Sequence, residues 1–548
     1  MRLAGFTLAL AVCFAGSALA QPSVTSLENI YSWTLPGLPN YGIAQGSIFA
    51  IFGANLASTT VPLQPPPLQT TLSGVTVNVT VGGTTTQALL YYLSPTQINA
   101  VLPSATPVGT GTITVTNGAG TSADFPIIVL KNGFGLLTWN YGNGPVQGYN
   151  ASDGYVLMNQ LAATNPGDVL ELWGTGLGPV QGDATLVNAG DSVEVDIGGV
   201  KAQLNYAGRS GFTGLDQINV VVPAGVSGCN ASVVVKSGNI YSNFGTLPVV
   251  ASGRTCSDPT IPFSADLLAK IAQTGSISIG VVGISQTTTQ GTTVGGITVG
   301  GGTTDSGHAD FIKFTYAEFI EGASYSGFAT SIGSCAVSFF KTSTNNPNPP
   351  QPFQFTYLNA GNDVNINGPN GLIAMPLTTT NGIEFYSTPS SVPSFIPASG
   401  GTFTFDNGSG GPDVGGFSTQ LQISAPFTWT NMNSISMVSR ASGLGVNWTG
   451  GDPGTFVNIT GLSFGAVNGS STDFVAGSFT CQAPTSAGSF TVPAAVLQSM
   501  PPSATIAGIS FSTLSLSNDT NPVTFSATGL DIGWASASAA YTINVTYQ

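Results

Sequence analysis

Apolar and polar residues alternate along much of the chain, in the manner of β-strands. Val75, Val77 and Val79 are separated by polar residues, and the segments 193–197 and 541–547 show a similar alternation. A period of two turns one face of a strand toward a core and the other toward water. Strands of this kind, separated by frequent glycine turns, are typical of sandwiches and barrels. The pattern therefore predicts an all-β protein.

One stretch of the chain is repeated. Residues 44–56 align with 165–177 at an offset of 121, and residues 97–99 align with 217–219 at an offset of 120. Self-similarity at a fixed spacing indicates two copies of one structural unit. Each copy, with about ninety residues and six or seven predicted strands, has the size of an immunoglobulin-like sandwich. We expect two superposable antiparallel sandwiches.

Each copy opens with the pattern G-x-x-Φ-x-Φ-x-G-x-x-L, where Φ is apolar, at residues 46–56 and 167–177. This opening resembles the IPT/TIG class of immunoglobulin-like domains. The resemblance covers 164–250 closely and 43–130 more loosely. It implies the fold of both copies and an exported protein.

The second copy also has a narrower resemblance. It is similar to a domain common at the C-termini of secreted acidobacterial proteins, through residues 166–179, 205–208 and 214–220. That family has no assigned chemistry. No functional residue is therefore carried over to this chain.

The repeat and the composition divide the chain into six expected parts. These are a signal peptide over 1–20, an immunoglobulin-like domain over 21–130, a connector over 131–163, a second immunoglobulin-like domain over 164–250, a linker over 251–263 and a β-rich C-terminal region of one or two domains over 264–548. Within the last part, residues 264–274 predict a short helix with one apolar face. The Thr- and Gly-rich stretch 286–307 predicts an exposed or disordered loop.

The first twenty residues resemble a secretory signal. Arg2 precedes the apolar run 3–14, and Ala18-Leu19-Ala20 has the form of a cleavage site. The apolar run is too short to span a bilayer, and no later stretch has the length of a spanning helix. We expect a secreted protein in the extracellular space or at the cell surface, with the periplasm as the other compartment that such a signal allows.

Charge narrows the range of partners. The chain has 10 Lys and Arg residues against 24 Asp and Glu residues, a formal net charge of −14. A nucleic-acid binder needs basic residues to displace counterions from phosphates, so nucleic acid is excluded as a partner. The hydrophobic content of 42% is too high for a disordered chain.

Four cysteines follow the signal: Cys229, Cys256, Cys335 and Cys481. An even count in an exported protein indicates disulfides, and four cysteines allow three connectivities. We predict Cys229–Cys256, which would clamp the linker onto the second copy, and Cys335–Cys481, which would close a long loop in the C-terminal region. Their spacing matches no zinc pattern.

Catalytic and metal-binding patterns are weak. His308 is the single histidine and lies beside the Thr/Gly stretch, where a solvated loop residue is expected. Residues 461–465 match G-x-S-x-G, which a glycine-rich chain contains by chance. Asp363, Asn365 and Asn367 begin like a calcium loop, but Ala374 stands where its bidentate glutamate belongs. We assign no catalytic residue and no cofactor, and we do not expect an enzyme.

Exposed aromatic residues are the remaining candidates for a binding role. Trp429 and Trp448 could stack on sugars, as could four aromatic residues of the connector, Trp139, Tyr141, Tyr149 and Tyr155. Aromatic residues of β proteins lie more often in the core. The sequence favours an exported, non-catalytic structural or binding protein whose extracellular or cell-surface ligand is unknown. The alternatives are a carbohydrate-binding or carbohydrate-active protein, with a polysaccharide partner, and a calcium-dependent adhesin.

Overall fold

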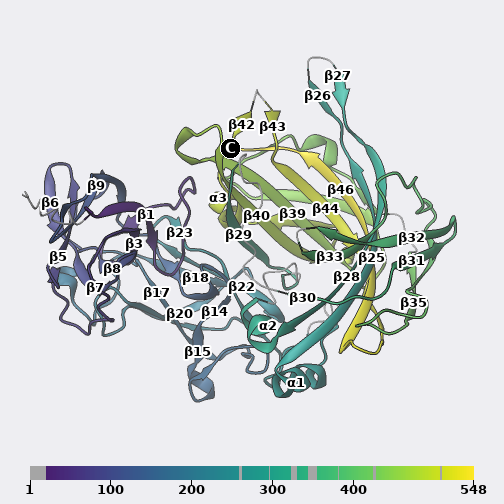
Figure 1. Cartoon of the computed structure of the whole chain (residues 1–548), viewed down its shortest axis with the longest axis horizontal. Helices are drawn as coiled ribbons and strands as arrows, with labels where there is room; N and C mark the ends of the chain where they lie inside the picture. The colour runs from purple at the N-terminus through teal and green to yellow at the C-terminus, as the bar shows by residue number, and fades with distance from the viewer. Residues whose placement is uncertain are drawn as a thin grey trace, which may run out of the picture.

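The computed structural model describes residues 20–257, 262–294, 297–322, 330–343, 355–380, 382–423, 427–506 and 509–548. The expected signal peptide lies, except for Ala20, outside the described residues. Two small β-sandwiches follow one another along the chain, and a much larger curved sheet forms the rest (Figure 1). The predicted all-β architecture of tandem sandwiches and a β-rich C-terminal region is confirmed.

The first sandwich has two sheets. One has the order β1 (Ser23–Asn29), β3 (Ile48–Ala54), β8 (Gln97–Val101), β7 (Leu89–Leu93). The other has the order β2 (Ile43–Ala44), β11 (Phe125–Leu130), β9 (Gly109–Asn117), β5 (Val75–Val81), β4 (Thr71–Leu72), with β10 (Gly120–Thr121) and β6 (Thr84–Gln87) at its sides. Its core contains Phe49 and Ile51 of one sheet and Val77, Val79 and Val115 of the other.

The second sandwich repeats this arrangement and adds strands from the connector. One sheet has the order β16 (Val156–Leu157), β15 (Gly148–Asn150), β17 (Val169–Thr175), β21 (Asp216–Val221), β20 (Gln203–Arg209), with β12 (Gly135–Leu136) beside β17. The other has the order β13 (Thr138–Asn140), β14 (Asn143–Val146), β24 (Gly245–Val249), β22 (Gly228–Ser237), β18 (Val193–Ile197), β19 (Val200–Lys201), with β23 (Ile240–Tyr241) beside β22.

The two sandwiches agree residue by residue at their centres. Ile51 faces Ile98 in β3–β8, and Leu172 faces Ile218 in β17–β21, at the offsets of the sequence repeat. Both copies also have a register shift in the neighbouring pair, β7–β8 or β20–β21. The pairing is antiparallel except at one edge of each sandwich, where β2 runs parallel to β11 and β14 to β24.

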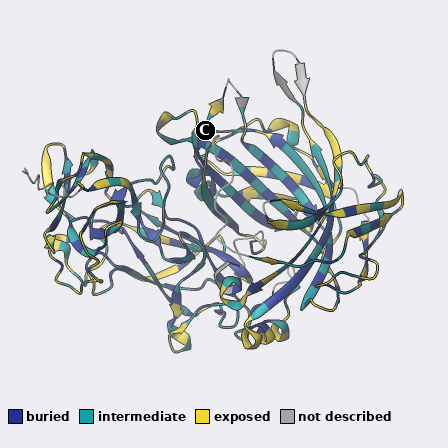
Figure 2. Ribbon diagram, in the orientation of Figure 1, coloured by how far each residue is buried: buried dark blue, intermediate teal, exposed yellow. Residues whose placement is uncertain are grey.

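The C-terminal region is built on one 14-stranded sheet. Its order is β29 (Cys335–Ser343), β40 (Asp473–Pro484), β39 (Phe456–Ala466), β44 (Thr513–Asp519), β46 (Ile532–Asn544), β25 (Ser276–Thr289), β28 (Gly302–Thr315), β33 (Ile383–Ser387), β32 (Gly371–Thr380), β31 (Asp363–Gly368), β34 (Gly401–Asp406), β35 (Ser418–Ile423), with β30 (Thr356–Tyr357) and β45 (Val523–Phe525) at its sides. Buried and half-buried residues alternate along its strands (Figure 2).

Smaller elements complete this region. A three-stranded sheet has the order β36 (Phe427–Trp429), β38 (Leu444–Gly450), β41 (Ser489–Val492). Three further pairs are β26 (Thr292–Val294) with β27 (Ile297–Val299), β37 (Met437–Val438) with β47 (Thr546–Tyr547), and β42 (Thr505–Ile506) with β43 (Ile509–Ser510). The α-helices are α1 (Ala265–Thr274), α2 (Tyr316–Gly322) and α3 (Ala494–Ser499), and 3-10 turns lie at Ala151–Asp153, Gln181–Asp183, Met432–Ser434, Val467–Gly469 and Thr485–Ala487.

Two local predictions have opposite outcomes. The predicted helix is confirmed as α1, where Ser264 Oγ accepts a hydrogen bond from Leu267 N and Leu268 and Ile271 are buried. The predicted loop over 286–307 is wrong, because β25 and β28 pair across 14 residues on each strand, from Ser276↔Thr315 to Thr289↔Gly302. Threonine is β-branched and suits extended backbone, so this composition extends two strands.

Two disulfides are present, joining the same cysteines as the predicted pairs. Cys229 of β22 is bonded to Cys256, with Cα atoms 5.5 Å apart. Cys335 of β29 is bonded to Cys481, which lies directly opposite it on β40. In the described parts of the chain, no helix has the length and apolar character needed to cross a bilayer.

Candidate functional site

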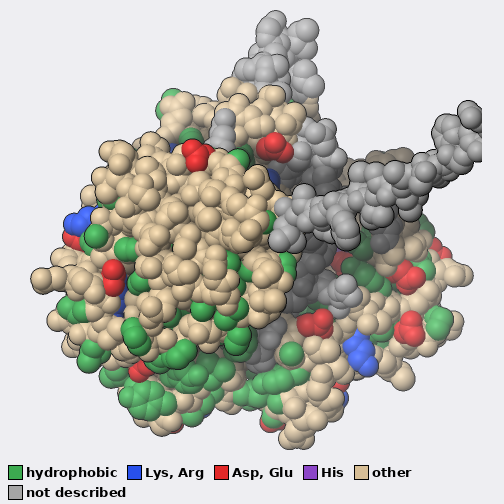
Figure 3. Space-filling view, turned by 60° about the vertical axis from the view of Figure 1, so that its left-hand side comes forward, with side chains coloured by type: hydrophobic (Ala, Val, Ile, Leu, Met, Phe, Trp, Pro, Cys, Tyr) green, Lys and Arg blue, Asp and Glu red, His purple; other side chains and the backbone are tan. Residues whose placement is uncertain are grey.

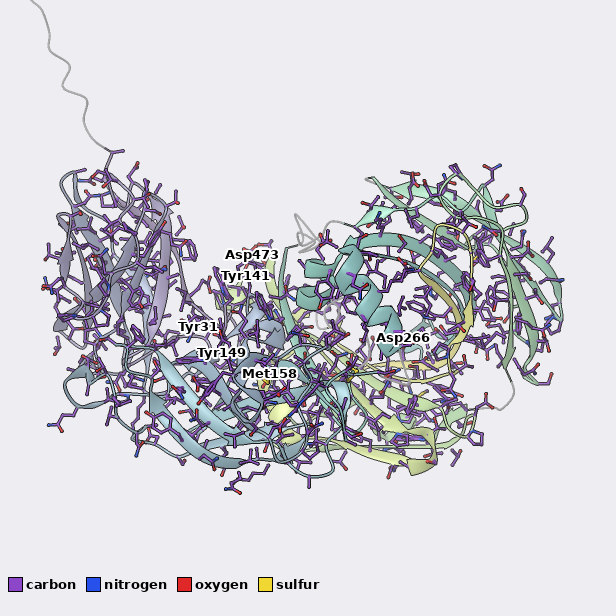
Figure 4. The ribbon with its side chains drawn as sticks, turned by 90° about the horizontal axis from the view of Figure 1, so that it is seen from below. Tyr31, Tyr141, Tyr149, Met158, Asp266 and Asp473 are labelled. Carbon is purple, nitrogen blue, oxygen red and sulfur yellow. A yellow bond between two sulfur atoms is a disulfide. The ribbon has the colours of Figure 1, made fainter. Side chains whose placement is uncertain are left out.

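A groove of about 340 Å³ lies where the first sandwich, the second sandwich and the C-terminal sheet meet. Seen from below, Tyr141 lies in the gap between the first sandwich and the large sheet (Figure 4). The groove is lined from the loop after β1 by Ser32, Trp33, Thr34, Leu35 and Asn40, from the second sandwich by Asn140, Tyr141, Gly142, Asn143 and Asn243, and from β29 by Phe339, Phe340 and Lys341. Three segments that are far apart in sequence therefore form one concave surface, which we call the junction groove.

The hairpin between β13 and β14 presents Tyr141. Its two-residue turn is Tyr141-Gly142, with φ of 46° and 89°, and two positive φ values are what a type I′ turn requires. Asparagine or glycine normally fills the first position, because a side chain with a bulky Cβ is strained there by about 1–2 kcal/mol. Tyr141 is nevertheless 69% exposed, so no core packing compensates for the strain.

The turn is held against the loop after β1. A Cβ on Gly142 would lie 1.9 Å from the carbonyl oxygen of Ser32, so only glycine permits this backbone contact. The Gly142 N–H donates to Thr138 Oγ1 at 3.1 Å, and Asn243 Nδ2 donates to the Gly142 carbonyl at 2.9 Å. These contacts fix Tyr141 beside the loop.

Trp33 faces Tyr141 from the other side of the groove. The two rings are perpendicular, at 89°, with centroids 5.0 Å apart, and Trp33 also contacts Phe52 at 5.7 Å. Trp33 has a φ of 51°, again in the left-handed region that disfavours a tryptophan. Asn29 holds this turn, because its Oδ1 accepts from Tyr31 N and Ser32 N while the Trp33 N–H donates to the Asn29 carbonyl. Strained non-glycine residues cluster at functional sites, and here two of them are aromatic and in contact.

Asparagine amides supply the polar part of the groove. Asn40 Nδ2 donates to the Tyr241 carbonyl at 3.2 Å. Its Oδ1 is buried, and among the described residues no donor reaches it. A buried acceptor without a partner costs about 1–3 kcal/mol.

The nearest charges are Lys341, which lines the groove, and Glu28 on β1. Burial raises the pKa of Glu28 to about 7, although the charge of Lys341 acts in the opposite direction. Glu28 Oε2 is buried and accepts no hydrogen bond from any described residue. Burial, followed by the charge of Glu28, also raises the pKa of Tyr41 to about 12. Charged side chains are also sparse over the face of the molecule shown in Figure 3.

A buried ion pair fixes the two sandwiches relative to one another. Arg209 is 2% exposed; its Nη1 donates to Asp216 Oδ1 and its Nη2 to the carbonyls of Gly46 and Gly178, at 3.1 and 2.9 Å. Asp216 Oδ2 accepts from the N–H groups of Gly176 and Leu177 at 2.7 and 2.8 Å. Both carboxylate oxygens and both terminal guanidinium nitrogens are hydrogen-bonded, which offsets part of the desolvation cost of burying the pair.

The C-terminal sheet is held to the second sandwich by separate contacts. Asn230 N donates to Ser331 Oγ at 3.0 Å, and Ser331 N donates to the Asn230 carbonyl at 3.3 Å. Val234 and Phe244 of the second sandwich join the core cluster of the C-terminal region. The three walls of the junction groove therefore belong to parts that pack against one another.

The aromatic residues named from sequence have different surroundings. Trp429 and Trp448 are 4% and 2% exposed, pair with each other across β36–β38 and donate their ring N–H groups to Asn431 Oδ1 and the Thr485 carbonyl. This burial contradicts their role as stacking residues, because neither ring has a free face. Tyr149 and Tyr155 are exposed but line none of the junction groove. Of the four connector aromatic residues considered, Tyr141 is the one that lines the groove.

The weak calcium pattern is contradicted by its backbone. Asp363, Asn365 and Asn367 lie on β31, a regular strand of the sheet, rather than on a loop. A calcium loop of this type brings its ligands together by turning around the ion, which a regular strand does not do. In the described parts of the chain, no cluster of three or more His, Cys, Asp or Glu side chains is suited to a metal.

His308 and Ser463, to which the sequence assigns no catalytic role, are also part of the sheet. His308, expected in a loop, lies within β28 and pairs with Gly283 and Ser387. Ser463 of the G-x-S-x-G match lies in β39 and donates to the Pro501 carbonyl at 2.8 Å, so it is not at a strand–helix turn.

Sequence analysis missed Trp33 and Asn40, because a positive φ and a contact between distant segments leave no pattern along the chain.

No protein-family model and no curated protein matches the chain. Among solved structures it is similar to the Plexin A4 extracellular region, at 16% identity and a TM-score of 0.15, over 44% of this chain and 19% of that chain. It is similar to SGBP-B of the Bacteroides ovatus mixed-linkage glucan utilization locus, solved with a mixed-linkage heptasaccharide, at 14% identity and a TM-score of 0.21, over 47% of this chain and 59% of that chain.

A third similar structure is a Ca²⁺-stabilized, ice-binding adhesin of an Antarctic bacterium, at 12% identity and a TM-score of 0.12, over 96% of this chain and 100% of that chain. The chain thus spans about a fifth and about three-fifths of the first two proteins. These are distant similarities between β-rich proteins. They do not bear on the ligand of this chain.

Proposed function

We propose that the protein is an exported, non-catalytic binding protein that holds its ligand in the junction groove. The observation that carries the proposal is the pair Trp33 and Tyr141. Both residues have a strained backbone with positive φ, their rings are in contact, and Tyr141 is exposed. Tyr155 is also strained and exposed, so the feature that distinguishes Tyr141 is its contact with a second strained aromatic residue in a groove. A contact made outside the folded chain would explain this combination.

An exported location is supported by two disulfides and by the signal-like residues 1–20. The sandwiches then act as a rigid support that positions the loop after β1 against the β13–β14 hairpin. The IPT/TIG resemblance, and the narrower similarity to the domain of secreted acidobacterial proteins, agree with such a supporting role and remain predictions from the sequence.

The test is retention of the mature protein on cell envelopes and insoluble polysaccharides, with and without calcium. Tyr141→Asn removes the ring and suits the turn, so we expect retention to fall at least tenfold while the fold is kept. Tyr155→Asn is the matched control, since Tyr155 is also exposed and has a φ of 60°, outside the groove. Equal retention of both variants and the parent would contradict the proposal. Retention that needs calcium and ignores Tyr141 would favour an adhesin instead.

A further inference from the structure

We infer that the junction groove binds a sugar ring of an uncharged oligosaccharide, an inference that rests on the binding role proposed above. The groove holds about 340 Å³, near the low end of the range of about 300–1,000 Å³ for small-molecule sites. That volume suits one or two sugar rings rather than a folded partner. Three features of the groove point to this class of ligand.

The first feature is the angle between the aromatic rings. Trp33 and Tyr141 are perpendicular and form a corner, not a parallel slot. A pyranose ring has an apolar C–H face and a rim of hydroxyl groups, so it packs its face on one ring and its edge on the other. The corner therefore fits a sugar ring.

The second feature is the set of amide groups. Asn40, Asn140, Asn143 and Asn243 line the groove, and each asparagine side chain has N–H donors and a carbonyl acceptor. A proline-rich peptide, the other common ligand of aromatic grooves, offers few N–H groups because proline has none. A sugar hydroxyl both donates and accepts, which matches the amide groups along the groove.

The third feature is charge. Lys341 is the single charged residue among those that line the groove, and the other lining residues are neutral. A polyanionic ligand needs several cationic side chains, and this lining offers one ammonium. An uncharged sugar therefore fits this lining better than an acidic one.

The experiment is calorimetric titration of the mature protein with cellohexaose, xylohexaose and laminarihexaose, alongside an oligogalacturonate and a proline-rich peptide. We expect at least one neutral hexasaccharide to bind. Tyr141→Asn and Asn40→Ala should each weaken that binding at least tenfold, whereas Tyr155→Asn should change it less than twofold. Thermal melting of each variant shows whether it is folded. If Asn40→Ala does not fold, the test rests on Tyr141→Asn.

The other outcomes separate the two proposals. Binding of only the oligogalacturonate or only the peptide would overturn the uncharged-sugar inference and leave the groove as a binding site. If no probe binds but retention on cell envelopes still depends on Tyr141, the uncharged-sugar inference is wrong and the groove remains a binding site. If no probe binds and retention is independent of Tyr141, both proposals are wrong.

Discussion

The two sandwiches descend from one pattern but differ where they meet other parts of the molecule. The first copy turns tightly between β7 and β8 at Pro95-Thr96, with Ser94 N donating to the Gln97 carbonyl. The second copy replaces this turn by a longer loop between β20 and β21, over residues 210–215. Leu215, at its end, packs against Ile48 and Val101 of the first copy.

The same loop brings the ion pair to the joint. Arg209 and Asp216 flank it, and Asp216 occupies the position that Thr96 has in the first copy. The central strand pairs of the two copies have equivalent registers, whereas the loop, the ion pair and a disulfide belong to the second copy. Duplication therefore supplied the stable unit, and changes at its ends supplied the contacts that form the groove.

The largest effect is expected from a variant that disrupts this contact between the two sandwiches. Asp216→Ala would leave the Arg209 guanidinium buried without its carboxylate, and we expect the free energy of unfolding to fall by about 3–5 kcal/mol. Thr96→Ala, the matched change in the first copy, should cost less than about 0.5 kcal/mol. Urea denaturation followed by tryptophan fluorescence measures both. Similar values for the two variants would show that the ion pair does not distinguish the copies.

The disulfide of the second copy gives the next effect. Cys229 and Cys256 are 27 residues apart, and closing a loop of this length stabilises by about 3–4 kcal/mol through the unfolded chain. Replacing both cysteines by serine should lower the denaturation midpoint accordingly and leave the first copy folded. Non-reducing peptide mapping checks the bond itself. A peptide that joins Cys256 to Cys335 would contradict the pairing.

Glu28 makes the first copy sensitive to pH. Its ordinary pKa of 4.5 is raised to about 7 by burial, so the folded chain holds a proton that the unfolded chain releases. The resulting stability is complete below pH 4.5 and is lost as the pH rises to about 7, by about 1–3 kcal/mol. Glu28→Gln should remove this loss between pH 5 and pH 8.

The control for this experiment is Glu194→Gln in the second copy. The hydrogen bond from Lys201 lowers the pKa of Glu194, so this residue stays ionised over the whole interval. The free energy of unfolding of Glu194→Gln, measured by denaturation at pH 5 and pH 8, should therefore still fall as the pH rises. A loss of the dependence in Glu194→Gln, or its persistence in Glu28→Gln, would place the titrating group elsewhere.

The smallest effect concerns the hairpin that has no sequence counterpart in the first copy. Tyr141→Asn replaces a strained residue by one that favours the turn, and we expect a gain of about 1 kcal/mol. Tyr155→Asn should give a similar gain at its own positive φ. A loss of stability in Tyr141→Asn would mean that contact with Trp33 contributes more than the strain costs.

Sequence reasoning succeeded where the information is local or repeated. The offsets near 120 predicted both sandwiches because residues that pair in one copy correspond to residues that pair in the other. The apolar face of residues 264–274 predicted α1 because helical spacing acts over a few residues.

It failed where the fold depends on distant pairing. The single 14-stranded sheet could not be predicted, because its neighbouring strands come from opposite ends of the C-terminal region. The groove was missed for a similar reason, since Trp33, Tyr141 and Phe339 are brought together by packing. Trp429 and Trp448 were wrong candidates, because alternation identifies a strand without showing which of its faces is covered.

The pairing of β25 with β46 has a consequence for synthesis and export. These strands lie side by side and parallel, and Ser278 N donates to Asp531 Oδ2 at a separation of 253 residues. Contacts between residues so far apart in sequence form slowly, because a long loop must close before they contribute to stability. While the C-terminal residues are still emerging, β25 has an unpaired edge that invites aggregation. The sheet is therefore completed only once β46 has been synthesised, so a chain exported in an unfolded state has to be protected from aggregation until then.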